Sequence, residues 1–358
     1  MVPSTIPTAG HLISAYALGV VVGAPLIAGL AAKVSRRRLL LVLMAVFTIG
    51  NIATAVATSY GALLAARFLS GLPHGAYFGV ASVVAASMVP ADRRGRAVST
   101  LMVGLTIANI VGVPAATRVG QTFGWPAAYV GVSLIAMLCL VSIFAAVPAV
   151  QIGEGSQSIR SELSALRRPQ VWFALVTGMV GFGGMFATYS YIAPTVRSLS
   201  GLSELGVVWI LAVYGVGMTI GMVVGGRLAD RALVATLLGG LASLAVVLAV
   251  FSLLAVTPVG AFLAVVALGV TSTVLLPALQ TRLMDVAREG QSLAAALNHA
   301  TLNVANALGA WLGGVVLAAG YSYAWPSRVS TVLPLAGIAV FVVGLAVERR
   351  SRQASRRH

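Results

Sequence analysis

The stretch GRLADR, residues 226–231, places two arginines and one aspartate between two long apolar runs, 206–226 and 233–255. Each run is long enough to cross a bilayer, which takes a helix of about 20 residues. Similar runs fill most of the remaining chain: 11–32, 39–58, 61–88, 97–117, 126–147, 171–195, 260–281, 292–319 and 329–347. Because a segment in lipid must satisfy its own backbone hydrogen bonds, helices are the default. The sequence therefore predicts an all-α polytopic membrane protein with eleven transmembrane helices.

The composition agrees with lipid as the main solvent of this chain. Of 358 residues, 59% are hydrophobic and 9% are charged, and the mean hydropathy is +0.99. A soluble domain carries about 25% charged residues to cover its surface. These values exclude a cytosolic enzyme, a secreted disulfide scaffold and a disordered protein. Cys139 is the single cysteine, so the chain has no intramolecular disulfide.

The net charge of +15 comes mainly from loops on one side of the predicted membrane. Alternate loops and the C-terminal tail hold nineteen of the 23 Lys and Arg residues, the other loops hold three, and Arg67 lies inside a span. Because Lys and Arg accumulate in cytoplasmic loops, we expect the first set and the C-terminus to face the cytoplasm. The N-terminus of this chain is then exterior. A nucleic-acid partner is not expected from charges placed in this way.

Three pairs of similar segments indicate an internal repeat. They recur at offsets of 198, 197 and 195 residues, in the motif loops, the glycine-rich stretches and the short basic turns: Ala32 with Asp230, Gly112 with Gly309, and Gly95 with Gly290. The repeat predicts an N-terminal bundle of five helices at 1–147, a cytoplasmic linker at 148–170, and a six-helix bundle with a basic tail at 171–358.

The same repeat predicts a helix upstream of Met1. The span 171–195 opens the second half, and its counterpart, 198 residues earlier, falls before the first residue. Residues 1–10 carry no charge, which is typical of an exterior loop rather than of the positively charged start of a signal peptide. We therefore expect eleven of twelve helices, with the first one absent through a misassigned start or a truncation. A genuine eleven-span protein is the alternative.

Two parallel six-helix halves, each with a basic loop after its second helix, resemble the major facilitator superfamily. GRLADR is similar to its signature loop, although Ala32 and Ser35 replace the usual Asp and Gly in the first copy. RFLSGLPHGAYFG (67–79), GVVVGAP (19–25), PALQTR (277–282) and NHATLNVAN (298–306) resemble the drug:proton antiporter branch. That branch includes arabinose/sugar efflux, purine-ribonucleoside efflux and chloramphenicol-resistance permeases. The resemblance implies proton-coupled efflux by two bundles that rock around a central site.

Arg67 is the only charged residue well inside a predicted span. An ionised side chain there costs roughly 2.5–3.5 kcal/mol on insertion scales, so it usually faces a water-filled cavity or a partner. Snorkelling to the membrane surface is the alternative. In the resembled family the matching arginine takes part in proton coupling. His74 lies two turns further along the same face, where it could carry a proton or make a packing hydrogen bond between helices.

The tenth span places His299, Asn303 and Asn306 on one helical face. Such a face in lipid is expected to line the central cavity or to hydrogen-bond to a neighbouring helix. Weaker cavity candidates are Gln280, Asn109, Thr106 and Tyr16. All eight acids lie in loops or at span ends. In the resembled family a proton-coupling acid commonly lies in the first helix, so we expect proton coupling to be impaired in the chain as given.

A second set of residues is expected to control conformational change. Gly104, Gly112 and Pro114 resemble the fifth-helix antiporter motif, although GVPAAT (112–117) replaces the family's Gly-Pro-x-x-Gly-Gly. The motif loops are expected to make charge contacts between the bundles at the cytoplasmic face, with topology anchoring as the alternative for the basic run 36–38. The residues concerned are Gly226, Asp230, Arg231, Lys33, Arg36 and Arg37.

These patterns predict a proton-coupled exporter of a small organic molecule, such as chloramphenicol, a sugar or a nucleoside, in the cytoplasmic membrane of a bacterium. Uptake by a facilitator or symporter is the alternative. The sequence shows no group of His, Asp, Glu or Cys with the spacing of a metal or acid–base site, so neither an enzyme nor a cofactor beyond the proton gradient is expected. The expected partners are a small-molecule substrate, protons and membrane lipid, and the expected state is a monomer.

Overall fold

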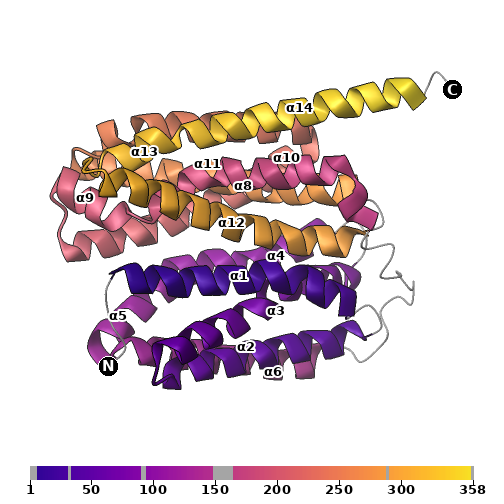
Figure 1. The fold of residues 1–358 in the computed structure, drawn as a ribbon, viewed down its shortest axis with the longest axis horizontal. Helices are drawn as coiled ribbons and strands as arrows, with labels where there is room; N and C mark the ends of the chain where they lie inside the picture. Colours follow the sequence, from indigo (N-terminus) through magenta and orange to yellow (C-terminus); the bar gives the residue numbers. More distant parts are fainter. Residues whose placement is uncertain (1–5, 31–33, 90–93, 148–163, 288–289, 356–358) are drawn as a thin grey trace. The chain divides into compact units, whose positions relative to one another are not determined.

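A computed structural model describes residues 6–30, 34–89, 94–147, 164–287 and 290–355 (Figure 1). Within these ranges the chain is helical and contains no strand. The helices of the N-terminal half are α1 (Ile6–Leu30), α2 (Arg36–Val56), α3 (Tyr60–Ser87), α4 (Arg94–Ile107), α5 (Val113–Phe123) and α6 (Trp125–Ala146). Those of the C-terminal half are α8 (Pro169–Tyr189), α9 (Ile192–Ser200), α10 (Glu204–Leu254), α11 (Pro258–Ala287), α12 (Gln291–Ala318), α13 (Trp325–Ser330) and α14 (Val332–Ser355), preceded by a 3₁₀ turn at Ala165–Arg167.

The helices follow the predicted spans and confirm the all-α membrane fold. Eight stretches of the described residues are long and apolar enough to cross a membrane. One of them, α10, has 51 residues and contains two predicted spans. A kink at Ala232, where the backbone is not helical (φ −155°, ψ 72°), divides it into two helices. The GRLADR stretch therefore ends one span, and the next begins directly after it.

The fifth predicted helix of the family is interrupted at its centre. A π-helical turn, Ala108–Gly112, separates α4 from α5, and Pro114 follows in the first turn of α5. Proline has no backbone N–H, and its ring clashes with the carbonyl group four residues earlier, here that of Ile110. Widening the helix by one residue per turn relieves this clash, and such turns are common at functional sites.

The described chain divides into two compact units. The first unit comprises 1–105, 112–165 and 288–303, and the second comprises 106–111, 166–287 and 304–358. The repeat predicts bundles at 1–147 and 171–358. That prediction places 106–111 in the N-terminal bundle and 288–303 in the C-terminal one, whereas the two units have them exchanged. That division stays a prediction, and residues 148–163 of its linker lie outside the described residues.

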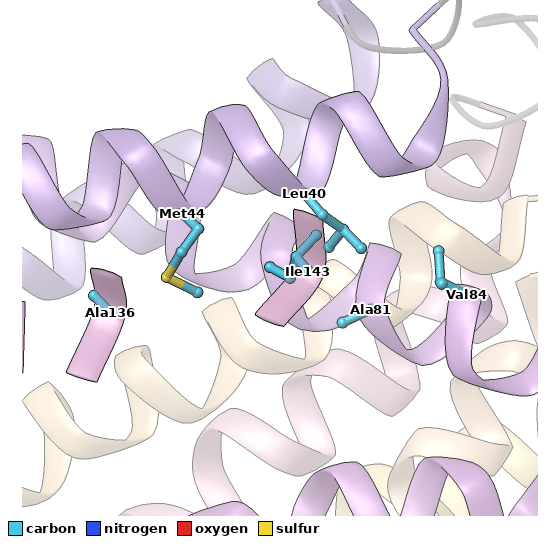
Figure 2. Close-up of a cluster of buried hydrophobic side chains, with 6 residues drawn as sticks. All are labelled: Leu40, Met44, Ala81, Val84, Ala136 and Ile143. Carbon is cyan, nitrogen blue, oxygen red and sulfur yellow. The ribbon is translucent and has the colours of Figure 1, made fainter. Parts of the chain in front are cut away.

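In the first unit, α3 packs against both α1 and α2, and α2 also packs against α6. Figure 2 shows the apolar core between α2, α3 and α6, which contains Leu40, Met44, Ala81, Val84, Ala136 and Ile143. On its other side, α3 approaches α1 at Gly19 and Gly71, where an added Cβ would collide with the carbonyl oxygens of Phe68 and Tyr16 respectively. Glycine is required there because the two backbones touch.

In the second unit, α10 packs along α11, and α8 packs along α14. Arg282 of α11 forms a 2.5 Å ion pair with Glu348 of α14, and the two side chains are only 11% and 18% exposed. Gln170 of α8 accepts a hydrogen bond from Arg282 (3.3 Å) and donates one to the carbonyl of Gly344 (2.9 Å). This network joins α8, α11 and α14.

Candidate functional site

The helix α3 places three candidate side chains on one face. Arg67, His74 and Phe78 are separated by seven and then four residues, which brings them within about 40° of one another around an α-helix. Tyr16 of α1 and His299 of α12 contact this face. We call these five residues the histidine cluster. All of them belong to the first unit.

A hydrogen bond joins α1 to α3 inside the cluster. The hydroxyl oxygen of Tyr16 lies 2.7 Å from Nδ1 of His74. With a neutral imidazole protonated on Nε2, the hydroxyl donates to Nδ1; a protonated imidazole instead donates from Nδ1 to the hydroxyl oxygen. A change in the protonation state of His74 therefore reverses this hydrogen bond and requires the Tyr16 hydroxyl to turn. The backbone contact at Gly71 holds the two helices close enough for this bond.

Arg67 lies over aromatic rings rather than beside a carboxylate. Its guanidinium carbon is 4.4 Å from the centre of the Tyr16 ring and 5.3 Å from that of Tyr129 on α6. Such cation–π contacts stabilise a charge by about 0.5–2 kcal/mol, the upper value applying where water is excluded. The Nε atom is buried and makes no hydrogen bond, so the aromatic faces supply part of the stabilisation that water would otherwise give.

The ring of His299 stacks on the ring of Phe78, which lies one helical turn after His74 on α3. His299 is 8% exposed, and its ring lies 4.6 Å from that of Phe78 at an interplanar angle of 23°. The rings of His74 and His299 meet edge to face, with their centres 6.0 Å apart. Asn303, one turn further along α12, donates a hydrogen bond to the carbonyl oxygen of His299 (2.8 Å). The titratable rings of His74 on α3 and His299 on α12 thus lie side by side.

Among the described residues, no acidic side chain belongs to the same unit as the histidine cluster. The described acidic side chains are Glu204, Asp230, Asp285 and Glu348, and all belong to the second unit. Among the five members of the histidine cluster, Arg67 is the only permanent charge. A proton taken up by either histidine therefore adds a second positive charge to the cluster, which an anion or the loss of that proton would relieve.

The structure brings together part of the predicted site. Arg67, His74 and His299 form one cluster, and Asn303 lies beside it. Tyr16, expected only as a weaker candidate, is central, because it contacts both Arg67 and His74. The remaining cavity candidates belong to the second unit and stay predictions: Asn306, Gln280, Asn109 and Thr106. Of these, Thr106 is buried and the other three are half-buried.

Phe78 and Tyr129 were missed by the sequence reasoning. Phe78 had a usable signal, because it lies four residues after His74 and so shares its helical face. Tyr129 had none: its place near Arg67 depends on the packing of α6, which periodicity does not reveal.

The residues expected to control conformational change occupy different environments. Asp230 and Arg231 are exposed next to the kink at Ala232, and Gly226 is half-buried one turn earlier. Arg36 and Arg37 open α2 and are half-buried, whereas Lys33 lies outside the described residues. Gly104 and Gly112 are exposed. Gly112 is the last residue of the π-helical turn, Gly104 precedes the turn by four residues, and Pro114 follows it. Their roles in conformational change remain predictions.

A family model described as Major Facilitator Superfamily matches residues 4–292 and 209–358. The inner membrane transport protein YdhP of Escherichia coli K12 is 41% identical over 346 residues, which cover 97% of this chain and 88% of that protein. The chloramphenicol resistance protein of Streptomyces lividans is 33% identical over 357 residues, covering 92% and 90% of the two chains. The crystal structure of the human organic anion transporter MFSD10 (TETRAN) has a TM-score of 0.70 at 17% identity, over 93% of this chain and 83% of that one. At that identity the likeness shows the fold alone.

Proposed function

This chain belongs to the major facilitator superfamily, and on that premise we propose that it exports a small organic molecule from the bacterial cytoplasm in exchange for protons. Membership confirms the family resemblance seen in the sequence and makes the chain a membrane transporter of small solutes rather than an enzyme. The direction of transport, the coupling ion and the substrate are the parts that we propose.

The histidine cluster carries the proposal, because it supplies titratable groups within the described spans. The impaired proton coupling expected from the sequence stays a prediction, which the dye assay below also tests. Proton-driven transport needs a titratable group inside the membrane, and histidine changes its charge near physiological pH. His74 is bonded to Tyr16, whose ring lies beneath the Arg67 guanidinium. The protonation of His74 is therefore coupled to the position of the Tyr16 hydroxyl and, through the ring, to the charge of Arg67.

We propose that the cluster carries one proton at a time. Protonating both histidines would place two positive charges about 6 Å apart, judged from the 6.0 Å between the ring centres. At an effective dielectric constant of 20, this repulsion is about 3 kcal/mol. One of the two imidazoles therefore stays neutral while the other is charged, and the proton leaves when substrate takes its place beside Arg67.

The substrate class follows from the polarity of the candidate residues. Arg67, the histidines and the amides of Asn303, Asn306, Gln280 and Asn109 are cationic or neutral, which favours neutral or anionic molecules over lipophilic cations. The Streptomyces relative is a chloramphenicol resistance protein, and this likeness favours export of a drug such as chloramphenicol. A sugar or a nucleoside fits the same polarity.

The wider arrangement in the membrane is part of the same proposal. We place the C-terminus and the basic loops in the cytoplasm, on the bacterial cytoplasmic membrane, following the distribution of Lys and Arg. The protein acts as a monomer embedded in lipid and exposes its site alternately to the two sides. The kink at Ala232 and the π-helical turn at 108–112 are the places where we expect the helices to bend during this change.

The test uses inside-out vesicles with an acidified lumen and a pH-sensitive dye. Chloramphenicol, a neutral sugar and a nucleoside are added in turn, and export predicts that at least one of them makes the lumen more alkaline. His74→Asn should abolish this signal. The matched control is His11→Asn: His11 also bonds a tyrosine of α3 from α1 (Tyr60, 2.8 Å), but at an exposed position outside the cluster.

Two outcomes would contradict the proposal. Equal dye signals from His74→Asn and His11→Asn would show that His74 does not carry the transported proton. Equilibration of a radiolabelled probe without any dye signal would establish the alternative, a facilitator that needs no proton.

A further inference from the structure

An open apolar groove of about 420 Å³ runs along the outer side of the first unit, between α2 and α6. Its lining is entirely apolar and consists of Leu41, Val42 and Ala45 of α2, and Leu140, Val141 and Phe144 of α6. We call it the α2–α6 groove.

The groove has a fixed floor and exposed walls. Leu41 and Leu140 are partly buried, and both pack against the apolar core drawn in Figure 2, so the floor is supported from within. Val141 and Phe144 are 58% and 66% exposed. The groove is therefore a shallow, open depression with a supported floor, along which an elongated apolar group can lie.

The groove lies at the basic end of both helices. It occupies the second and third turns of α2, which begins at Arg36, and the last two turns of α6, which ends at Ala146. At 1.5 Å per residue, Arg38 precedes the centre of the groove on α2 by only about 8 Å along the axis. Arg38 is exposed, and Arg36 is half-buried. The ion pairs that the structure describes are Arg197–Glu204 and Arg282–Glu348, and neither involves these arginines.

Arg37 connects the basic end to the groove. Its Nη2 donates a 2.5 Å hydrogen bond to the carbonyl oxygen of Phe144, and its guanidinium carbon lies 5.1 Å from the centre of the Phe144 ring. The contact caps the last turn of α6 and fixes the aromatic wall of the groove. The Nε of Arg37 makes no hydrogen bond. With Arg37 held in this way, Arg38 is the described charge of α2 that lies on the groove's face of this helix.

From this juxtaposition we propose that the α2–α6 groove is a binding site for an anionic phospholipid of the surrounding bilayer. One acyl chain lies in the groove, and Arg38, which shares the groove's face of α2, holds the phosphate, while Arg36 adds positive charge at the same end of the helix. The occupant is lipid because both helices that form the groove are candidate membrane spans, and because the groove is apolar throughout and lies near clustered cations. These features match a molecule with a hydrocarbon chain and an anionic head. The site is independent of the histidine cluster and of the direction of transport.

The experiment measures lipid binding by native mass spectrometry of the full chain in detergent. Each basic residue near a membrane surface strengthens binding of anionic lipid about fivefold, so phosphatidylglycerol should bind at least fivefold more tightly than phosphatidylcholine. The double variant Arg36→Gln/Arg38→Gln should lose this preference. Its matched control is Arg349→Gln/Arg350→Gln, which removes the same charge from exposed positions at the end of α14 and should keep the preference.

A second variant tests the groove itself. Ala45→Trp fills it and should weaken the binding of both lipids, whereas Ile135→Trp, at a 70% exposed position of α6 outside the groove, should not. Equal binding by Ala45→Trp and wild type would overturn the proposal. So would a retained preference in the Arg36/Arg38 variant, or displacement of phosphatidylglycerol by glycerol phosphate at equal concentration, since the head group alone would then account for binding.

Discussion

Replacing Arg282 with methionine removes the positive charge from the buried pair with Glu348. At 2.5 Å and 11–18% side-chain exposure, this pair is shielded from water. Breaking a buried pair by removing one partner costs about 3–5 kcal/mol, because a carboxylate loses its counter-charge in a poorly solvated place. We therefore expect Arg282→Met to lower the free energy of unfolding by about 3 kcal/mol or more. The double variant Arg282→Met/Glu348→Met should lose less than the two single changes together, because an apolar pair of similar size can replace a buried ion pair.

The chain supplies its own control for this measurement. Arg197 and Glu204 also form an ion pair, but at 3.6 Å and with side chains 56% and 83% exposed. Solvent screening limits such pairs to about 1 kcal/mol or less. Equilibrium unfolding in mixed detergent micelles, followed by loss of helical signal, compares Arg282→Met with Arg197→Met. Equal losses from the two variants would refute the reasoning from burial. So would a double variant whose loss equals the sum of the two single losses.

Three further predictions concern the first unit and the interrupted fifth helix. Tyr16→Phe removes the hydroxyl that is hydrogen-bonded to His74 but keeps the aromatic ring next to Arg67. The rate of substrate-driven proton movement should fall about tenfold, which corresponds to the loss of one hydrogen bond to a group that becomes charged. The control is Tyr60→Phe, which removes the exposed hydroxyl bonded to His11 and should leave the dye signal unchanged. Gly71→Ala should destabilise the protein by about 1–3 kcal/mol, because its Cβ would meet the backbone of α1. Gly61→Ala on the same helix has open space around it and should not, as unfolding in mixed micelles would reveal. Pro114→Ala restores a backbone N–H, so the π-helical turn at 108–112 should revert to α-helix, and hydrogen–deuterium exchange there should become slower; unchanged exchange would show that proline is not the cause.

The spans could be predicted from the sequence because their signal is local. Hydropathy and length define a membrane helix without reference to its neighbours, so the boundaries of α2, 36–56 against a predicted 39–58, differ by only a few residues. The shared face of Arg67 and His74 follows in the same way from helical periodicity. These inferences need only the residues within one helix.

The contacts between helices could not be predicted in this way. His299 lies against Phe78 across more than 200 residues of sequence, and Tyr129 reaches Arg67 from α6. Helical periodicity shows which residues share one face of a helix, but not which neighbouring helix packs against that face. The kink at Ala232 is a similar case, because the same sequence is compatible with a loop or with a sharp bend.

The glycine contact between α1 and α3 has a consequence for laboratory evolution of this transporter. At Gly19 and Gly71 the obstructing atoms are carbonyl oxygens of the facing backbone, which every amino acid at positions 68 and 16 would carry. No compensating exchange of a facing side chain can therefore rescue a bulkier residue there. Selection for new specificity can vary the side chain of Phe68, whereas the two glycines should persist in every active lineage.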